Sequence, residues 1–306
     1  MKILVATEKP FAPSATDQIR SVAVAEGHEL ALLENYKSTS EFRAAVADAD
    51  ALIVRSDIVS GEILDSAPRL KIVVRAGAGY DNLDLAACSA HNVIAMNTPG
   101  QNSNAVAELV FLLMLHNARG GFAGKTGSEL RGKKLGLHAF GNVGRYVAEI
   151  GKGFGMDIFA FDPFLTQEAI SSSGVKACKS AGELYSECQY VSLHMPANKE
   201  TTGSIGYDLL MRMPPKAVLV NTARKEVVNE EELVKVFGAR PDFSYLADVQ
   251  PDCKALLEEN FKGRFLFTEK KMGAQTGEAN NNAGIAAARQ IVDYFKTGNE
   301  KFRLNK

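Results

Sequence analysis

Short apolar runs alternate with amphipathic segments along nearly the whole chain. In roughly the first 100 residues, the runs have strand length, and the segments between them repeat apolar positions at helical spacing. The expected strands are 3–6, 30–33, 51–54, 72–74 and 93–96, and the expected helices are 14–26, 41–47, 63–67 and 85–91. Strands that alternate with helices form a parallel sheet covered on both faces. We therefore expect a doubly wound α/β domain ending near Pro99.

The same pattern returns after the segment 103–117. This segment is apolar nearly all round, which is typical of a helix buried on several sides, and we place a domain crossing here. Further strands are expected at 135–140, 158–161, 175–177, 190–193, 217–220, 244–247 and 265–267. A last helix at 277–296, apolar on one side, would cross back to the first domain. The fold class is thus α/β, with two doubly wound parallel-sheet domains, Rossmann-like or flavodoxin-like, and a cleft between them.

The stretch 134–162 has the pattern of a dinucleotide-binding βαβ unit. A strand, a glycine-bearing turn at 139–144, a helix and a second strand ending at Asp162 follow one another. Glycines at such a turn let the backbone approach a pyrophosphate, and the helix N-terminus offers free N–H groups. The turn residues that we expect to contact the cofactor are Ala139, Gly141, Asn142, Val143 and Gly144.

Asp162 favours NAD over NADP as the cofactor. An acid about 20 residues after the turn binds the ribose hydroxyls, and its charge repels a 2′-phosphate. Ala139 departs from the pattern, because it stands where the first glycine is expected. A lone glycine-rich turn would also suit a sheet that binds no nucleotide. Strands on both sides and a terminal acid favour the cofactor site.

Composition narrows the classes of partner. A chain of 306 residues suits two domains, and a net charge of −1 without a basic block argues against nucleic acid or an anionic membrane as partner. The four cysteines form no CxxC pair and no cluster with histidine, so we expect free thiols and no metal. The apolar segment 105–115 is too short to span a membrane and no signal peptide is evident, so we expect a cytoplasmic protein.

Polar residues follow several expected strands directly. In parallel sheets, ligands bind beyond the carboxyl ends of the strands, so these residues are the first candidates for chemistry. They are Arg55, the run 75–79, His194, the run 221–224, Asp248, Lys270 and Lys271.

Six segments in a fixed order resemble one family over essentially the whole chain. They are RAGAGYDNLD (75–84), NTPGQNSNAVAEL (97–109), LGLHAFGNVGR (135–145), VSLHMP (191–196), VNTARKEVVNEEEL (220–233) and KMGAQTGEA (271–279). Together they resemble the D-isomer-specific 2-hydroxyacid dehydrogenases, and within that family the phosphoglycerate dehydrogenases. The resemblance implies NAD-dependent oxidation of a phosphorylated 2-hydroxy acid, D-3-phosphoglycerate, to 3-phosphohydroxypyruvate. It implies a substrate-binding domain of residues 1–100 and 286–306 and an NAD-binding domain of residues 101–285.

The resemblance also implies catalytic roles. Arg224 would bind the substrate carboxylate, since a guanidinium presents a planar fork to a planar anion, and backbone N–H groups of Gly77 and Ala78 would add donors. Lys271 stands where the family has its acid/base histidine. A lysine can act as the acid/base residue in place of histidine if a site closed from water lowers the pKa of its amine. Lys270 remains the alternative.

The family pairs its acid/base residue with a glutamate that this chain lacks. Strict counting reaches Cys253, and Asp252 is the nearest carboxylate, which we take as the stand-in. His194 is a rival base, but its motif lines the cofactor in the family. The residues expected on the cofactor beyond the glycine turn are Asp162, His194, Pro196, Thr222, Ala223 and Asp248.

The choice of substrate depends on Arg55 and Arg75. They match positions where phosphoglycerate dehydrogenases keep arginines, and two guanidinium groups suit a phosphate. One of them alternatively pairs only with a nearby acid such as Asp57 or Asp81. We favour the phosphate.

Two other functions remain open. A glyoxylate or hydroxypyruvate reductase would need no phosphate site, and an NAD-sensing interaction protein would need no catalysis.

The stretch 120–129 is shorter than the family's dimer-forming arm, although a homodimer is still expected. The chain ends at FRLNK, so we expect no amino-acid-binding regulatory domain.

Overall fold

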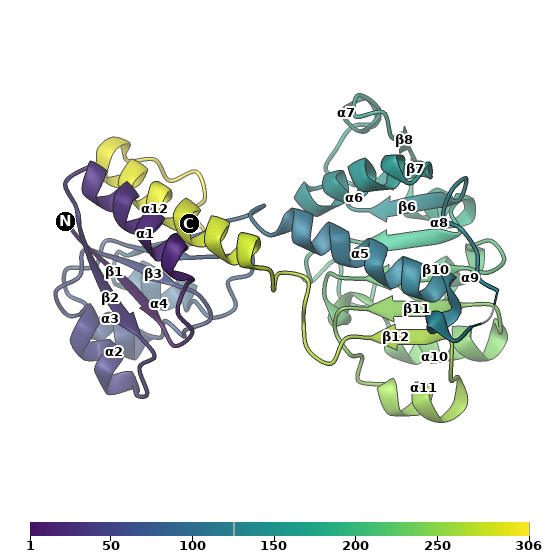
Figure 1. Ribbon diagram of the computed structural model, residues 1–306, viewed down its shortest axis with the longest axis horizontal. Helices are drawn as coiled ribbons and strands as arrows, with labels where there is room; N and C mark the ends of the chain where they lie inside the picture. Colours follow the sequence, from purple (N-terminus) through teal and green to yellow (C-terminus); the bar gives the residue numbers. More distant parts are fainter. Residues whose placement is uncertain (125, 306) are drawn as a thin grey trace. The chain divides into compact units, whose positions relative to one another are not determined.

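The computed structural model describes residues 1–124 and 126–305, which divide into two compact units (Figure 1). The first unit comprises Met1–Asn102 and Thr276–Lys306, and the second comprises Ser103–Gln275. Both are parallel sheets covered by helices, which confirms the predicted fold class. Lys125, within the short stretch 120–129, lies outside the described residues.

The chain returns to the first unit at Thr276, before the last helix, whereas the family resemblance implied residue 286. The reason is that α12 (Gly277–Thr297) packs as one body on α1 (Pro13–Ala25), as Figure 1 shows. Gly284 makes this contact close, because a Cβ there would lie 2.8 Å from the Phe11 ring and 2.9 Å from Ile19.

The sheet of the first unit has the strand order β2-β1-β3-β4-β5, the order of flavodoxin-like folds. Its strands are β1 (Lys2–Thr7), β2 (Glu29–Glu34), β3 (Ala51–Val54), β4 (Ile72–Arg75) and β5 (Ile94–Asn97). Alternate strand residues face opposite sides of the sheet. One set packs on α1 and α12, and the other packs on α2 (Thr39–Val46), α3 (Gly61–Asp65) and α4 (Leu85–Ala90).

The sheet of the second unit has the order β12-β11-β10-β9-β6-β7-β8. Its strands are β6 (Lys134–His138), β7 (Asp157–Phe161), β8 (Lys176–Ala177), β9 (Tyr190–Leu193), β10 (Val218–Asn221), β11 (Ser244–Ala247) and β12 (Phe265–Phe267). The order reverses between β6 and β9, and dinucleotides bind sheets of this kind at that reversal.

Helices cover both faces of the second sheet. The long helices α5 (Ser103–Ala118) and α6 (Asn142–Gly153) pack with α7 (Gln167–Ser171) on one face. The other face is covered by α8 (Ala181–Glu187), α9 (Tyr207–Arg212), α10 (Glu230–Ala239) and α11 (Lys254–Asn260). Two short 3-10 turns, η1 (Gly120–Phe122) and η2 (Lys225–Val227), complete the unit. Among the described residues, no helix is long and apolar enough to cross a bilayer.

The α6 helix approaches β6 closely at Gly144. A Cβ on Gly144 would lie 2.7 Å from the carbonyl oxygen of Ala139, and backbone cannot yield as a flexible side chain does. At Gly153, at the other end of the same helix, a Cβ would meet nothing within 4 Å. Gly144 is therefore required by packing, whereas Gly153 is not.

We expect Gly144→Ala to destabilise the second unit by about 1–3 kcal/mol, because the added methyl group forces α6 away from β6. Gly153→Ala is the matched control and should be neutral or stabilising by up to about 1 kcal/mol, because alanine has the higher helix propensity. The midpoints of urea unfolding of the two variants measure the difference. Equal midpoints would contradict the packing role of Gly144.

Candidate active site

The turn between β6 and α6 departs from ordinary backbone geometry at one residue. Ala139 has φ 76°, in the left-handed region that glycine adopts freely and alanine does not. Its N–H donates to the Phe161 carbonyl on β7 at 2.9 Å, which holds the turn against the neighbouring strand. Ala139 therefore adopts the strained backbone conformation that the first glycine of the fingerprint would adopt freely, and the turn keeps the shape that the pattern predicts.

The start of α6 offers the features of an anion-binding site. Gly141, the residue before the helix, provides no side-chain cap, and a Cβ there would meet nothing within 4 Å. Asn142 and Val143 are the first helical residues, so their N–H groups belong to the unpaired first turn. Free N–H groups beside an open glycine suit a pyrophosphate.

Asp162 lies beside the same turn. Its carboxylate accepts hydrogen bonds from the Phe140 N–H at 2.8 Å and from the Phe164 N–H at 2.9 Å. Both bonds are made by the backbone, so the carboxylate is held in place next to the glycine turn. Each oxygen keeps a further lone pair for a ribose hydroxyl.

Two buried polar atoms at the neighbouring strand ends have no partner among the described residues. They are the Nε2 of His194, after β9, and the Oγ1 of Thr222, after β10. Buried polar groups are nearly always hydrogen-bonded, so such atoms indicate a missing partner. The residues present thus fit a dinucleotide at this edge of the sheet. Pro196, two residues beyond His194, is exposed on the same segment.

His194 does not have the protonation behaviour of a base at neutral pH. Burial, with a smaller contribution from the nearby His138, lowers the pKa of His194 to about 3. Burial likewise lowers the pKa of His138 to about 4. Both rings are therefore uncharged at neutral pH, which suits residues that line a cofactor.

The turn after β10 brings the two predicted catalytic cations together. The Lys271 Nζ donates to the Ala223 carbonyl oxygen at 3.2 Å, and the Arg224 Nη1 donates to the same oxygen at 3.0 Å. Asn221 fixes this turn, because its Oδ1 accepts the Ala223 N–H at 3.0 Å and its Nδ2 donates to the Arg224 carbonyl at 2.9 Å. The residue predicted to bind the substrate carboxylate and the residue predicted to carry the proton thus bond to the same carbonyl oxygen.

The loop that carries Lys271 is held by Asp248, which is fully buried. Its carboxylate accepts hydrogen bonds from the backbone N–H groups of Met272 and Gly273, both at 2.7 Å, and from the Thr268 hydroxyl at 3.1 Å. A Cβ on Gly273 would lie 2.8 Å from this carboxylate, which explains the glycine there. Asp248 therefore positions the loop, and its contact with the cofactor stays a prediction.

Asp252 pairs with a residue other than the one expected. Its carboxylate forms an ion pair with the Lys225 Nζ at 2.6 Å, and its side chain is largely exposed. Its N–H and that of Cys253 donate to the carboxylate of Glu230, at 3.0 and 2.7 Å. Lys225 is thus the partner of Asp252 that the structure shows, and the expected pairing of Asp252 with Lys271 stays a prediction.

In the first unit, Arg55 is held by neutral oxygens. Its guanidinium donates to the carbonyl groups of Lys9 at 2.7 Å and Pro10 at 3.1 Å, and to the Asn280 Oδ1 at 2.8 Å. The group also lies over the Phe11 ring, 5.1 Å from its centroid. The alternative that Arg55 is neutralised by Asp57 is not supported, because Asp57 accepts the backbone N–H of Arg55 at 3.2 Å.

The turn after β4 brings Arg75 and Gly77 together. The Arg75 Nε donates to the Arg55 carbonyl at 2.9 Å, and its guanidinium occupies the place where a Cβ of Gly77 would stand. Gly77 has φ 150°, which also favours glycine. Its N–H donates to the Arg75 carbonyl at 2.9 Å, so this expected substrate donor is already engaged. Ala78 is the remaining backbone donor of the pair.

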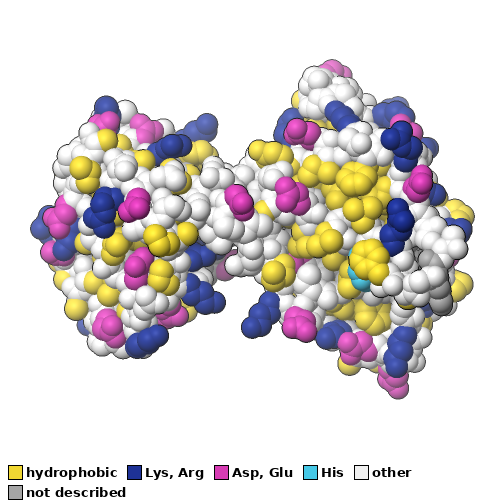
Figure 2. Space-filling model, viewed as in Figure 1, with side chains coloured by type: hydrophobic (Ala, Val, Ile, Leu, Met, Phe, Trp, Pro, Cys, Tyr) yellow, Lys and Arg dark blue, Asp and Glu magenta, His cyan; other side chains and the backbone are white. Residues whose placement is uncertain are grey.

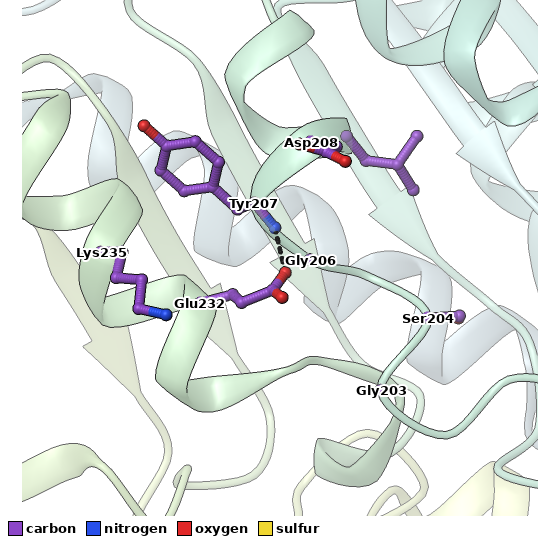
Figure 3. Close-up of a pocket in the computed structure, with 8 residues that line it drawn as sticks. Gly203, Ser204, Gly206, Tyr207, Asp208, Glu232 and Lys235 are labelled. Carbon is purple, nitrogen blue, oxygen red and sulfur yellow. Dashed lines mark hydrogen bonds between the residues drawn. The ribbon is translucent and has the colours of Figure 1, made fainter.

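A polar hollow of about 420 Å³ lies elsewhere in the second unit. It is lined by residues before and within α9 and by Glu232 and Lys235 of α10, and it contains none of the predicted site residues. Figure 3 shows the Glu232 carboxylate directed at the Tyr207 N–H, which donates to it at 2.6 Å. The carboxylate thus caps the start of α9.

Asn221 was among the candidates of the run 221–224, whereas the positioning residues Glu230 and Asn280 escaped the sequence reading. Asn221 carried a usable signal, because asparagine at a strand end often closes a turn with its own side chain. Glu230 and Asn280 carried no such sequence signal, because each acts on a segment far away in the sequence.

Among the described residues, no group of histidine, cysteine and acidic side chains has the arrangement of a metal site.

Comparison with known proteins gives consistent matches. Residues 115–260 match the model of the D-isomer specific 2-hydroxyacid dehydrogenase NAD binding domain. The chain is 33% identical over 82% of its length to a D-3-phosphoglycerate dehydrogenase of Methanocaldococcus jannaschii and spans 51% of that protein, about half its length. It is 31% identical over 86% of its length to a hydroxypyruvate reductase of Thermotoga maritima and covers 90% of that protein.

A solved structure matches over the full chain. It is the NAD⁺-bound 3-phosphoglycerate dehydrogenase of Entamoeba histolytica, with 46% identity, a TM-score of 0.87 and coverage of 100% of this chain and 99% of that one. The matched domain and this NAD⁺-bound neighbour confirm NAD as the cofactor predicted from the glycine turn and Asp162.

We expect Ala139→Gly to stabilise the second unit by roughly 0.5–1 kcal/mol, because glycine removes the cost of a positive φ. Ala255→Gly, at an exposed position of α11, is the matched control and should destabilise the unit by up to about 1 kcal/mol. Thermal unfolding of both variants tests this. A lower melting temperature for Ala139→Gly would show that the turn is unstrained.

Proposed function

The chain belongs to the D-isomer-specific 2-hydroxyacid dehydrogenase family, and we propose that it oxidises D-3-phosphoglycerate to 3-phosphohydroxypyruvate with NAD. The observation that carries the proposal is that Arg224 and Lys271 share the Ala223 carbonyl oxygen. Oxidation of a 2-hydroxy acid needs a cation for its carboxylate and a group that takes its hydroxyl proton. The two side chains supply both at one point of the sheet edge.

In the proposed reaction, Arg224 binds the substrate carboxylate with its planar fork. Lys271, as a neutral amine, accepts the proton of the substrate hydroxyl, and in the reverse direction its ammonium returns that proton to the keto oxygen. NAD, when bound, supplies the acceptor for the hydride on carbon 2. Asp248 orients Lys271 through the loop, and Asn221 orients Arg224 through the turn.

The cofactor is held by the residues around the α6 N-terminus. Gly141, Asn142 and Val143 would face the pyrophosphate, and Asp162 would accept the ribose hydroxyls. The unpartnered atoms of His194 and Thr222 would bond to the nicotinamide side of the cofactor. A neutral imidazole suits this role because it adds no further positive charge beside Arg224 and Lys271, the cationic side chains proposed to bind the substrate.

Arg55 supports a phosphorylated substrate. Its guanidinium is bound by neutral oxygens, so its positive charge is available to an anion. Arg75, fixed to the Arg55 carbonyl, would add a second cation. A non-phosphorylated keto acid needs neither group.

A second candidate is hydroxypyruvate or glyoxylate reduction. The match with the hydroxypyruvate reductase favours it, because the chain covers 90% of that relative, against half of the archaeal phosphoglycerate dehydrogenase. Hydroxypyruvate differs from 3-phosphohydroxypyruvate in the phosphate alone, and glyoxylate also lacks the carbon that bears it, so Arg55 and Arg75 separate the two functions. We favour the phosphorylated substrate, which would place the enzyme in serine biosynthesis in the cytoplasm.

We also propose a homodimer formed through the second unit. Figure 2 shows apolar side chains gathered over the region of α5. Leu112 on α5 is 59% exposed, Phe122 is 69% exposed, and Tyr146 on α6 is 41% exposed. Large apolar side chains grouped in this way are typical of a protein interface, and a second copy of the chain is the proposed partner.

The wild-type chain should consume NADH with 3-phosphohydroxypyruvate at a higher kcat/KM than with hydroxypyruvate or glyoxylate. Arg55→Ala should raise the KM for the phosphorylated substrate about 10- to 100-fold, because a charge-assisted hydrogen bond to phosphate is lost. The KM for hydroxypyruvate should stay unchanged. Equal use of all keto acids by the wild type would favour the reductase, and NAD binding without turnover would favour a sensing protein.

Lys271→Ala should lower kcat about 10²- to 10⁴-fold, the usual worth of general acid–base catalysis, with NAD affinity retained. Lys270→Ala is the matched control and should keep the activity. Because the neutral amine becomes more abundant as pH rises, oxidation should increase towards alkaline pH and reduction should decrease. Steady-state rates over a pH series measure both, and full activity of Lys271→Ala would overturn the assignment.

A further inference from the structure

The hydrogen bonds of Arg55 leave part of its guanidinium available. Two of its five N–H donors point to the Lys9 and Pro10 carbonyl groups, and one points to the Asn280 Oδ1. Within the part of the chain that the structure describes, the Nε–H and the second Nη2–H have no partner. The three acceptors are neutral, so they orient the planar group without cancelling its charge.

The nearest acid does not cancel the charge by contact either. Asp57 is buried, and its carboxylate accepts the Tyr36 hydroxyl at 2.8 Å, the Glu8 N–H at 2.8 Å and the backbone N–H of Arg55 at 3.2 Å. These bonds hold the carboxylate against a tyrosine hydroxyl and two backbone N–H groups, away from direct contact with the guanidinium of Arg55. Burial lowers the pKa of Arg55, as expected where a cation is partly desolvated without a contacting anion.

Asn280 joins this arginine to the long helix α12. It lies in the first turns of α12, and its Nδ2 donates to the Thr276 carbonyl at 2.9 Å. That bond determines which end of the amide faces Arg55: the nitrogen is used by Thr276, so the oxygen points to the guanidinium. Thr276 is itself the residue that caps α12, with its hydroxyl accepting the Ala279 N–H at 3.1 Å.

We propose that Asn280 is a positioning residue that determines specificity for a dianionic phosphate monoester, by holding Arg55 with a neutral oxygen. This inference rests on the proposed function. An aspartate of the same size would form an ion pair with Arg55 and neutralise the positive charge that would attract the phosphate of the substrate. It would also face the Thr276 carbonyl with an acceptor instead of a donor. A neutral amide is therefore the side chain that fixes the arginine and keeps it attractive to an anion.

The chain offers a matched control within the run Asn280-Asn281-Asn282. Asn282 is exposed on the same helix, and residues two positions apart on a helix do not face each other. Asn282→Asp thus makes the same change in charge and composition, two residues further along the same helix, without a contact to Arg55. Asn280→Ala removes the acceptor but adds no charge.

The experiment compares KM and kcat of the wild type, N280D, N282D and N280A for 3-phosphohydroxypyruvate and for hydroxypyruvate. N280D should raise the KM for the phosphorylated substrate about 10- to 100-fold, with kcat and the KM for hydroxypyruvate changed less than about twofold. N282D should match the wild type. N280A should raise the same KM by less than N280D, because the charge of Arg55 remains.

Each other outcome overturns the inference in a distinct way. If N280D and N282D behave alike, Asn280 does not govern the charge of Arg55. If N280D raises both KM values equally, Asn280 has only a structural role. If N280D does not fold, N280A decides, and an unchanged ratio of the two KM values overturns the inference. A wild type that does not prefer the phosphorylated substrate removes the proposed function and the inference together, and this is seen before any variant is made.

Discussion

A buried carboxylate holds the chemistry of the second unit in place. Asp248 has no exposed surface, and its two oxygens accept hydrogen bonds from the loop between β12 and α12. An ion removed from water costs several kcal/mol unless its hydrogen bonds are replaced, so this loop has little freedom to adopt another backbone path. Because Lys271 is the neighbour of Met272 in that loop, the backbone position of Lys271 depends on Asp248.

The shared acceptor at Ala223 gives the site its electrostatic character. An ammonium and a guanidinium that bond to one carbonyl oxygen repel each other. In the proposed reaction, a substrate carboxylate or the loss of the lysine proton would relieve this repulsion. Asp252 is meanwhile paired with Lys225.

Much of the fold could be predicted from sequence, because the apolar runs of parallel strands are almost continuous and the helices between them are amphipathic. The expected strands and helices appear with ends shifted by no more than two residues. The cofactor turn was also predictable, since glycine spacing and a terminal acid follow directly from backbone geometry. Even the positive φ of Ala139 follows, because that position requires left-handed backbone whatever residue occupies it.

The contacts of the charged side chains could not be predicted in this way. Lysine and arginine side chains have several rotatable bonds, and their partners come from distant parts of the chain, as Asp252 with Lys225 and Arg55 with Asn280 show. Sequence proximity suggested Asp57 for Arg55, yet the short aspartate side chain reaches backbone N–H groups first. Asp57 thereby leaves the guanidinium to neutral acceptors. A charged residue next to an arginine in sequence is therefore weak evidence that the arginine is neutralised, and the acceptor type decides whether it can bind a ligand.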